Sequence, residues 1–325
     1  MKNVFVLASI ALCLPLLGGF YFRWQKEVSD ALEHQQWIEM VETAPFEARA
    51  LHSTVVYKNK LWVIGGWDGQ SVKPDIWYSS DGKNWKVARS NAPFGGRAGH
   101  SAVVFNNRLW VIGGIYLDKS NNFRDLNDVW VSDDGINWSR VTRNAGFSSR
   151  GGQSAVVFDN KLWIIGGVAN RGDVWYSRDG VNWKTAVKDN PLLRRAGHSA
   201  FVFDNKIWIL GGFGIDNNND FFQYSDLLYS ENGIDWETAS QTKNLVANSG
   251  HSAVVFNDKI WVIGGFRMNG KVIHSEDAIE WKISSLLSPY GERIGHTSAV
   301  FNNKIWIIGG NDWKENRNDV WTLGG

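Results

Sequence analysis

The chain contains very little cysteine, little proline and almost no excess of either charge. Cys13 is the single Cys among 325 residues, so no disulfide can form within the chain. Lys and Arg number 34 against 33 Asp and Glu, and the resulting net charge of +1 gives no electrostatic reason to expect nucleic acid as a partner. With 43% hydrophobic and 21% charged residues and only 6 Pro, the composition is that of a folded protein and excludes wholesale disorder.

One long uncharged run is present, at residues 4–22. Its length is close to the roughly 20 residues that a helix needs to cross a bilayer, and Trp24 follows it at the position of an interfacial aromatic. It fits an uncleaved signal anchor, or a cleaved signal peptide with a moderate site near Gly19; a lipoprotein signal at Cys13 fits less well because Leu12 is bulky.

We therefore expect residues 1–22 to form a hydrophobic helix that serves as a signal anchor or signal peptide, followed by a linker over 23–34. The protein would then be exported or membrane-anchored, on the periplasmic or extracellular side, with membrane contact through residues 4–22 if they are not cleaved. The basic residues on the two sides of the segment are nearly balanced, so its orientation stays open, as does cleavage.

Tryptophan and glycine are abundant, and both follow an internal repeat. The chain has 19 Trp and 34 Gly. A Gly-Gly pair returns every 45 to 53 residues, at 65–66, 113–114, 166–167, 211–212, 264–265 and 309–310. Each pair ends a run like that of residues 100–114, and a second block like that of residues 128–138 follows. Six copies of one unit therefore make up the chain after the linker.

Each unit reads as four short strands. In the second copy the strands are expected at 101–105, 109–112, 128–131 and 138–141. Asn106-Asn107 and Asp133-Asp134-Gly135 supply tight turns, because Asn and Gly tolerate positive φ. One such sheet cannot bury both faces alone, but radial stacking of copies does so. The sequence predicts an all-β fold, a six-bladed β-propeller of four-stranded antiparallel blades over residues 35–325.

Sixteen of the 19 tryptophans occupy repeat positions, which predicts that they pack between blades. They lie in strand two (Trp62, Trp110, Trp163, Trp208, Trp261, Trp306), in strand three (Trp77, Trp130, Trp175, Trp321) or at the start of strand four (Trp37, Trp85, Trp138, Trp183, Trp236, Trp281). The sixth copy lacks its own fourth strand, since the chain stops at Gly325. The missing Trp-led strand is found at residues 37–41, so we expect the N-terminal strand to complete the last blade.

These units resemble the kelch repeat. The resemblance is carried by an Arg, the run His-Ser-Ala-Val-Val, an aromatic before the double Gly, and a Trp some 20–25 residues later, and it covers residues 37–325. The Ser-x-Asp-Gly-x-x-Trp turns at 79–85 and 177–183 also resemble a shortened Asp-box of sialidase-type propellers. Both resemblances imply a fold and not an activity. The fifth copy departs from the pattern, with Lys271 in place of the strand-three Asp and Ala278 in place of the turn Gly.

The two faces of such a propeller differ in sequence. Antiparallel strands alternate in direction, so the turns between strands one and two and between strands three and four share one face, here called the plain face. The loops on the other face, here called the variable face, follow no repeat and run over 67–74, 115–127, 168–172, 213–225, 266–270 and 311–318. Because irregular loops on a rigid scaffold usually carry function, the ligand site is expected there.

Two sets of candidate ligand-binding residues lie on the variable face. The first is a repeated arginine ahead of strand one: Arg49, Arg97, Arg150, Arg195 and Arg293, with Asn248 in the fifth copy. A ring of guanidinium groups suits oxyanions, and arginines at such positions contact acidic peptides in some kelch proteins, but a structural role in each blade is the alternative. The second set comes from the variable loops: Trp67, Asp68, Tyr116, Arg124, Phe222, Tyr224, Arg267, Trp313 and Arg317.

Repeated histidines follow the arginines, namely His52, His100, His198, His251 and His296, with Gln153 in the third copy. We expect them to bridge neighbouring blades. No metal and no cofactor are expected: the stretch 216–220 begins like a calcium loop but has Phe221 where Gly is needed. A copper–radical site would need a Cys in the propeller, and no nucleophile, phosphate or dinucleotide motif is present.

Taken together, the residues favour a binding module that recognises a protein or glycan on the variable face, more than an enzyme. The alternative from another class is an exported sugar mutarotase or epimerase, resembling the kelch-type sialic-acid epimerases, with an axial arginine ring holding a carboxylate and a Glu or His as base. Ligand identity and oligomeric state stay open.

Overall fold

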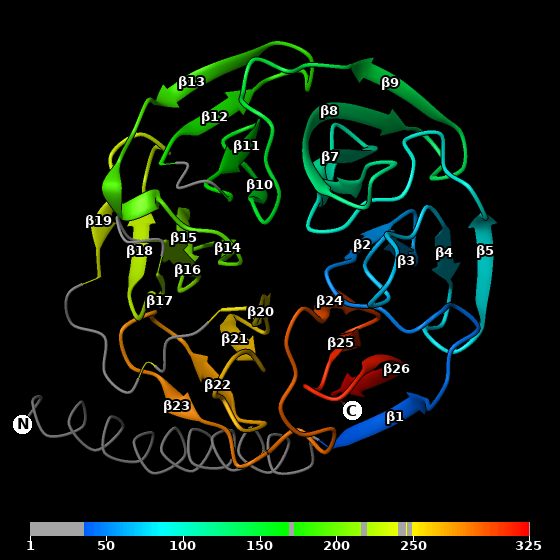
Figure 1. Ribbon diagram of the computed structural model, residues 1–325. Helices are drawn as coiled ribbons and strands as arrows, with labels where there is room; N and C mark the ends of the chain where they lie inside the picture. The colour runs from blue at the N-terminus through cyan, green and yellow to red at the C-terminus, as the bar shows by residue number, and fades with distance from the viewer. Residues whose placement is uncertain (1–35, 169–171, 216–219, 240–244, 246–248, 325) are drawn as a thin grey trace, which may run out of the picture.

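The structure, a computed structural model, describes residues 36–168, 172–215, 220–239, 245 and 249–324. It is the expected six-bladed β-propeller, with the blades arranged around a central axis (Figure 1). The helix predicted over residues 4–22 and the linker lie outside the described residues. Within the described ranges the one helical element is the short 3-10 turn η1 (Pro191–Leu193), and no helix there is long and apolar enough to cross a membrane.

Each blade is a four-stranded antiparallel sheet whose first strand is innermost (Figure 1). The first blade is β2 (Ser53–Tyr57), β3 (Lys60–Ile64), β4 (Ile76–Ser79) and β5 (Trp85–Arg89). The second is β6 (Ser101–Phe105), β7 (Arg108–Leu117), β8 (Phe123–Ser132) and β9 (Trp138–Thr142). The third is β10 (Ser154–Phe158), β11 (Lys161–Ile165), β12 (Val174–Ser177) and β13 (Trp183–Val187).

The other three blades repeat this order, except that the fourth carries an extra ribbon and the sixth takes its outer strand from the N-terminus. The fourth is β14 (Ser199–Phe203), β15 (Lys206–Leu210), β18 (Leu227–Ser230) and β19 (Glu237–Thr238), with an extra ribbon of β16 (Phe213–Ile215) and β17 (Phe221–Gln223). The fifth is β20 (Ser252–Phe256), β21 (Lys259–Ile263), β22 (Val272–Ser275) and β23 (Lys282–Ile283). The sixth is β24 (Thr297–Phe301), β25 (Lys304–Asn311), β26 (Asn316–Leu323) and β1 (Trp37–Val41).

The N-terminal strand closes the last blade, as the sequence predicts. β1 pairs antiparallel with β26, with Trp37 opposite Leu323 and Val41 opposite Val320. The two ends of the propeller are thus held by main-chain hydrogen bonds, and the ring has no open end to fray. Figure 1 shows β1 on the outside of the red C-terminal strand.

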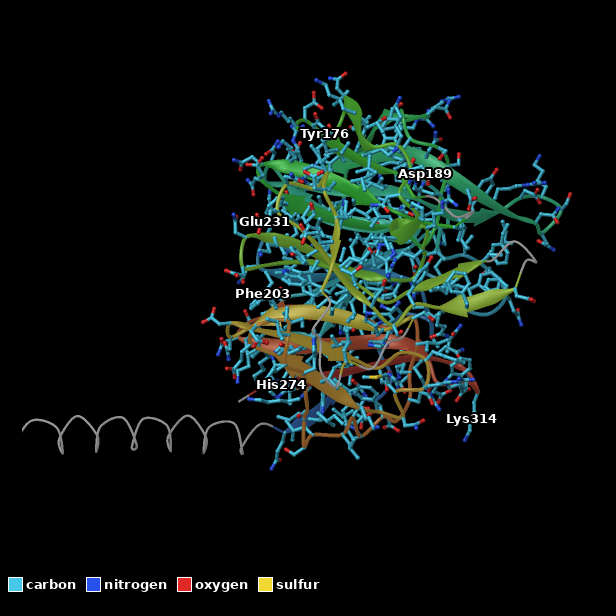
Figure 2. All side chains as sticks on the ribbon, turned by 90° about the vertical axis from the view of Figure 1, so that its left-hand side faces the viewer. Tyr176, Asp189, Phe203, Glu231, His274 and Lys314 are labelled. Atoms are coloured by element: carbon cyan, nitrogen blue, oxygen red, sulfur yellow. The ribbon has the colours of Figure 1, made fainter. Side chains whose placement is uncertain are left out.

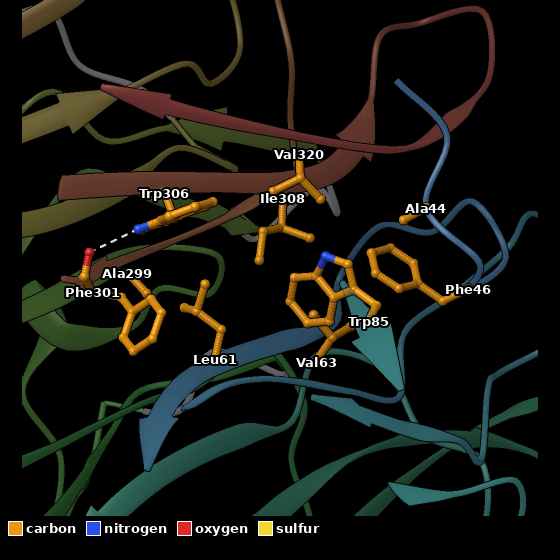
Figure 3. Close-up of a cluster of buried hydrophobic side chains, with 10 residues drawn as sticks. All are labelled: Ala44, Phe46, Leu61, Val63, Trp85, Ala299, Phe301, Trp306, Ile308 and Val320. Carbon is orange, nitrogen blue, oxygen red and sulfur yellow. Dashed lines mark hydrogen bonds between the residues drawn. The ribbon is translucent and has the colours of Figure 1, made fainter. Parts of the chain in front are cut away.

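The strand-two tryptophans form the contacts between blades. Each indole Nε1 donates to the carbonyl five residues earlier, as Trp306 does to Phe301 at 2.8 Å in the core cluster between the sixth and first blades (Figure 3). The indole ring then lies against the turn glycine of the next blade: a Cβ on Gly135 would lie 2.3 Å from the ring of Trp62. Only glycine fits there, which explains the Gly of the Ser-x-Asp-Gly turns.

The same turns are held by their own side chains. Gly82 N donates to Ser79 Oγ at 2.8 Å, and Asp81 accepts the main-chain N–H groups of Lys83 and Asn84. Burial alone would raise the pKa of Asp81, but these hydrogen bonds outweigh it and lower the pKa well below its usual value. The carboxylates of these turns are therefore structural, on the plain face.

Candidate functional site

Two ribbons and several loops rise from the variable face, whereas the plain face carries only tight turns. Figure 2 shows the propeller from the side: Phe203 and Glu231 lie at the plain face, and Lys314 lies at the variable face. The outer halves of β7 and β8 form one ribbon, in which Tyr116 pairs with Arg124. The other ribbon is β16–β17, in which Gly214 pairs with Phe222.

The five repeated arginines are buried and already paired within their own blades. Arg49 has no exposed surface; its Nη1 and Nη2 lie 2.6 and 2.9 Å from the two carboxylate oxygens of Asp75, and Nη1 also donates to Gly65 O. The same fork recurs between Arg97 and Asp128, Arg150 and Asp173, Arg195 and Asp226, and Arg293 and Asp319. Burial alone would raise the pKa of Asp75, but hydrogen bonding from Arg49 and its charge lower it.

This pairing decides between the two roles left open by the sequence. A ligand carboxylate could reach one of these forks only by displacing a partly buried aspartate, and leaving that charge unpaired is costly. The five arginines join strand three to the segment before strand one and cap a carbonyl of the double Gly. Their geometry is that of blade construction and not of a free anion site.

The repeated histidines line a narrow polar channel on the axis. The channel has a volume of about 260 Å³ and is lined by His52, His198, His251, His296 and Gln153 together with Ser and Thr hydroxyls. Burial, followed by the charge of the neighbouring arginine, lowers the pKa of His52, His198 and His296 to about 3. His52 Nε2 lies 2.8 Å from Thr297 Oγ1 of the sixth blade, and His296 Nε2 lies 2.9 Å from Ser252 Oγ of the fifth, so these two rings bridge blades, as expected.

A closed ring of main-chain hydrogen bonds, with one residue from each blade, surrounds the propeller axis next to this channel. Each ring residue lies just before a repeated His or Gln and donates its N–H to the carbonyl of the ring residue in the preceding blade, at 2.8 to 3.2 Å. The six members are Leu51, Gly99, Gly152, Gly197, Gly250 and Gly295, and all have positive φ. Every amide N–H of the ring is thereby satisfied.

An apolar hollow, here called the bowl, lies on the outer side of that ring. Its volume is about 370 Å³. Leu51, Gly197, Gly250 and Gly295 of the ring form its floor. Its wall comes mainly from the residue after four of the six double Gly pairs, namely Trp67, Phe213, Phe266 and Asn311, with Ile294 and Trp313. Trp313 packs edge-on against Phe266, with ring centroids 5.4 Å apart. Trp313 and Leu51 are nevertheless 51% and 45% exposed.

A second hollow, here called the groove, adjoins the bowl. It has a volume of about 700 Å³ and runs between the β16–β17 ribbon and the fifth blade. Phe222, Tyr224 and Arg267 line it, and it shares Phe213, Ser249 and Phe266 with the bowl. The guanidinium of Arg267 stacks over Phe266 at 4.9 Å, and that of Arg195 lies 3.8 Å from the centroid of Tyr224.

The structure thus brings together five of the nine variable-loop candidates, namely Trp67, Phe222, Tyr224, Arg267 and Trp313, in these two hollows. The other four line neither of them. Asp68 accepts from Ser71 and pairs with Lys73 at 2.5 Å, Arg124 pairs with Asp118 at 2.9 Å, and Arg317 pairs with Asp312 at 2.6 Å. Tyr116 lies in the β7–β8 ribbon.

Sequence reasoning missed the rest of the bowl. Phe213 and Phe266 directly follow a double Gly, the same position as Trp67, and a comparison of the repeats at that position would have grouped them. Leu51 occupies the position that is glycine in the other five copies, another departure visible in the sequence.

Comparisons with known proteins agree with the repeat pattern. Residues 28–167 match the model of the KLHDC2/KLHL20/DRC7 kelch-repeats domain. The chain is thus a six-bladed β-propeller whose N-terminal part matches a kelch-repeats domain. Among solved structures, one titled "Structure of YjhT" superposes on this propeller with a TM-score of 0.68 at 15% identity, covering 86% of this chain and 96% of that one. At that identity the likeness concerns the fold alone, which 633 solved chains share at a detectable level. No curated protein matches the sequence.

Proposed function

We propose that this kelch propeller is a binding module that takes a protein ligand on its variable face. The observation that carries the proposal is the bowl: an aromatic-lined apolar hollow at the centre of that face, in which Trp313 stays half exposed. Soluble proteins seldom leave large aromatic side chains clustered in the open, and such clusters are typical of interaction sites.

Two further observations support protein as the ligand class. The chain carries kelch repeats, which generally form protein-binding propellers. The bowl and the groove together form an elongated depression with walls from several blades, and its aromatic and arginine residues are the types that dominate the energetics of protein contacts. A glycan stays the second ligand class, with the aromatic walls as its contact surface.

The enzyme alternative receives no support from the site. An epimerase of the kind considered needs an acid and free arginines converging on the axis. The five arginines are instead paired with aspartates, and the axial channel and the bowl are separate hollows with no lining residue in common. Among the described residues, the floor of the bowl presents Leu51 and three glycines and no carboxylate.

We also propose that the module is exported or tethered to a membrane, with residues 4–22 as leader or anchor. Trp37, the first residue of β1, pairs with Leu323, which also pairs with Ile305 just beyond the plain-face turn at Asn302-Asn303. The leader therefore joins the propeller at the plain face, and the variable face points away from the attachment. Fractionation of cells expressing the full chain tests the tether: recovery in the carbonate-washed membrane is expected, and recovery in the cytosol contradicts it.

The ligand face is tested by photo-crosslinking in the native host. A benzoyl-phenylalanine placed at Phe222 on the variable face is compared with one at Val181 on the plain face, both of which are exposed. We expect a discrete protein adduct from position 222, and its binding to the purified chain is then measured directly. Adducts from position 181 alone, or a glycan in place of a protein in the direct measurement, would contradict the proposal.

A further inference from the structure

Two bulky hydrophobic residues of the bowl are held in a backbone conformation that is costly for them. Leu51 has φ 55° and Trp313 has φ 74°, both in the left-handed region that favours glycine. In the main-chain ring, the other five members are glycines with φ between 56° and 69°, so the ring itself asks for glycine. Leu51 therefore adds backbone strain at a position where glycine, the residue of the other five repeats, would be unstrained.

Packing does not repay this strain. Leu51 and Trp313 are 45% and 51% exposed, so much of the apolar surface that each adds is left in contact with water. Residues held in strained conformations with exposed apolar side chains are characteristic of ligand sites, where the cost is recovered on binding. Because both side chains line the same bowl, their common purpose is to shape it.

The chemistry of the bowl selects an apolar side chain. Each N–H group of the ring donates to the carbonyl of the ring residue in the preceding blade, so the ring offers no free main-chain donor to a polar ligand. The walls are the faces and edges of Trp67, Phe213, Phe266 and Trp313. A volume of about 370 Å³ holds one or two side chains and not a folded surface.

The groove selects the form of the chain that carries this side chain. Strand β17 borders the groove and pairs with β16, and no described strand pairs with its second edge. Phe221 and Phe222 of β17 are 73% and 40% exposed. An open strand edge beside a groove fits an extended peptide, which supplies the missing main-chain hydrogen bonds.

Charge at the rim indicates what flanks the apolar residue. Arg267 lines the groove next to Phe266, on which its guanidinium stacks, and forms no ion pair with a described residue. In the neighbouring loops, Arg317 pairs with Asp312 and Lys73 with Asp68. Glu292 accepts a hydrogen bond from the main-chain N–H of Arg267 and not from its side chain. The guanidinium N–H groups can therefore donate to a ligand carboxylate.

From these features we infer that the ligand is an extended segment of a protein partner, which inserts one large apolar side chain into the bowl and places a neighbouring carboxylate at Arg267 in the groove. The inference rests on the proposed function, because it names the chemistry of the protein ligand proposed there. Leu51 is a specificity-determining residue of this site, and its left-handed backbone is maintained for binding at the expense of stability.

The experiment uses the full chain in detergent and an array of nine-residue peptides. The central residue is Trp, Leu, Ala or Gln, and the flanking charges are Glu or Lys. We expect Trp and Leu peptides with flanking Glu to bind, Ala and Gln peptides to bind at least about tenfold more weakly, and Arg267→Gln to remove the preference for Glu over Lys.

Leu51→Gly separates this role from a merely structural one. It keeps the ring hydrogen bonds and relaxes the backbone, so it raises Tm by about 2 °C while weakening the best peptide about tenfold. The equivalent ring position in the second blade is Gly99, so the ring hydrogen bonds are compatible with glycine there. A lower Tm, or unchanged peptide affinity, overturns the role of Leu51.

The outcomes distinguish this inference from the broader function. An array that prefers polar centres or basic flanks, or that binds no peptide while the crosslinked partner still binds the variable face, overturns the inference and leaves the binding module in place. Crosslinks confined to the plain face overturn both. A glycan that occupies the bowl, displaced by no peptide, also overturns the inference.

Discussion

The indole of Trp110 in the second blade lies against Gly180 in the third, so closely that a Cβ on Gly180 would fall 2.2 Å from the ring. The same contact recurs between Trp62 and Gly135 and between Trp306 and Gly82. The fifth blade breaks the rule with Ala278, which is fully buried with φ 62°. Its partner Trp208 is 7% exposed, more than the 1–2% of Trp62, Trp110 and Trp306.

This difference gives a matched pair of substitutions. Gly180→Ala should destabilise the propeller by about 3–4 kcal/mol, because the new methyl overlaps the indole and the backbone is left-handed. Ala278→Gly should stabilise it by about 1 kcal/mol, since it relieves the left-handed strain. Urea unfolding of both variants measures the two effects, and equal signs would show that the turn glycines do not set the spacing between blades.

The buried histidines predict a stability that falls on acidification. Burial and the adjacent arginine hold the pKa of His52, His198 and His296 at about 3, below the unfolded value near 6.5. As the pH falls from 6.5 toward 3, the unfolded chain takes up protons that the folded chain does not, so the free energy of unfolding falls. Each such histidine contributes about 1.4 kcal/mol per pH unit in that window.

The third blade supplies the control for this prediction. Gln153 stands in the histidine position there and donates to Ile112 O at 2.9 Å, so the site accepts glutamine. His198→Gln should fold and should flatten the dependence of unfolding free energy on pH by about one histidine's share. An unchanged slope between pH 6 and pH 4 would mean that His198 is protonated in the folded state.

The arginine ring predicts a loss of stability and not a selective loss of binding. Arg195→Ala leaves the partly buried Asp226 without its partner and should cost about 2–4 kcal/mol in unfolding free energy, below the cost for a fully buried pair because Asp226 is a quarter exposed. Replacement of both residues by Leu and Asn removes the stranded charge and should recover much of that loss. Thermal unfolding of the single and double variants checks this. An unchanged Tm of Arg195→Ala would show that the arginine does not stabilise the blade and would favour a role in ligand binding.

Closure of the ring by β1 predicts that the first strand is indispensable. An internal deletion of residues 36–42 removes every main-chain pair between β1 and β26 and opens the sheet order β1-β26-β25-β24. We expect loss of the cooperative unfolding transition and of protease resistance throughout the propeller. Trp37→Ala, which keeps the strand but removes the edge-on contact with Tyr290, should only lower Tm. A folded deletion variant would show that five complete blades hold the sixth without help.

Much of the fold could be predicted from the sequence because six copies report the same local rules. The double Gly, the Asn turns and the Trp positions fix strand number and blade size, and the missing fourth strand identifies β1 as its replacement. Even the arginine partner left a trace: the fifth copy, which has Asn248 in place of the Arg, is also the copy with Lys271 in place of the strand-three Asp.

The bowl could not be predicted in the same way. Its lining comes from four blades, and which side chains meet depends on how tightly the ring closes around the axis. Trp67 and Trp313 were found because they lie outside the repeated Trp positions, whereas Phe213 and Phe266 share the position of Trp67 after a double Gly without being tryptophans. The pairing of Arg317 with Asp312 and of Asp68 with Lys73 likewise depends on loop conformations that no periodic pattern encodes.

The main-chain ring from Leu51 to Gly295 allows the residues around it to change in evolution without disturbing the blades. Its bonds involve no side chain, so residues standing above it can be exchanged while the blades beneath keep their spacing. The residue after each double Gly is then a position that can be substituted independently around a fixed main-chain ring. New recognition properties could be grafted there, six positions at a time, onto an otherwise unaltered frame.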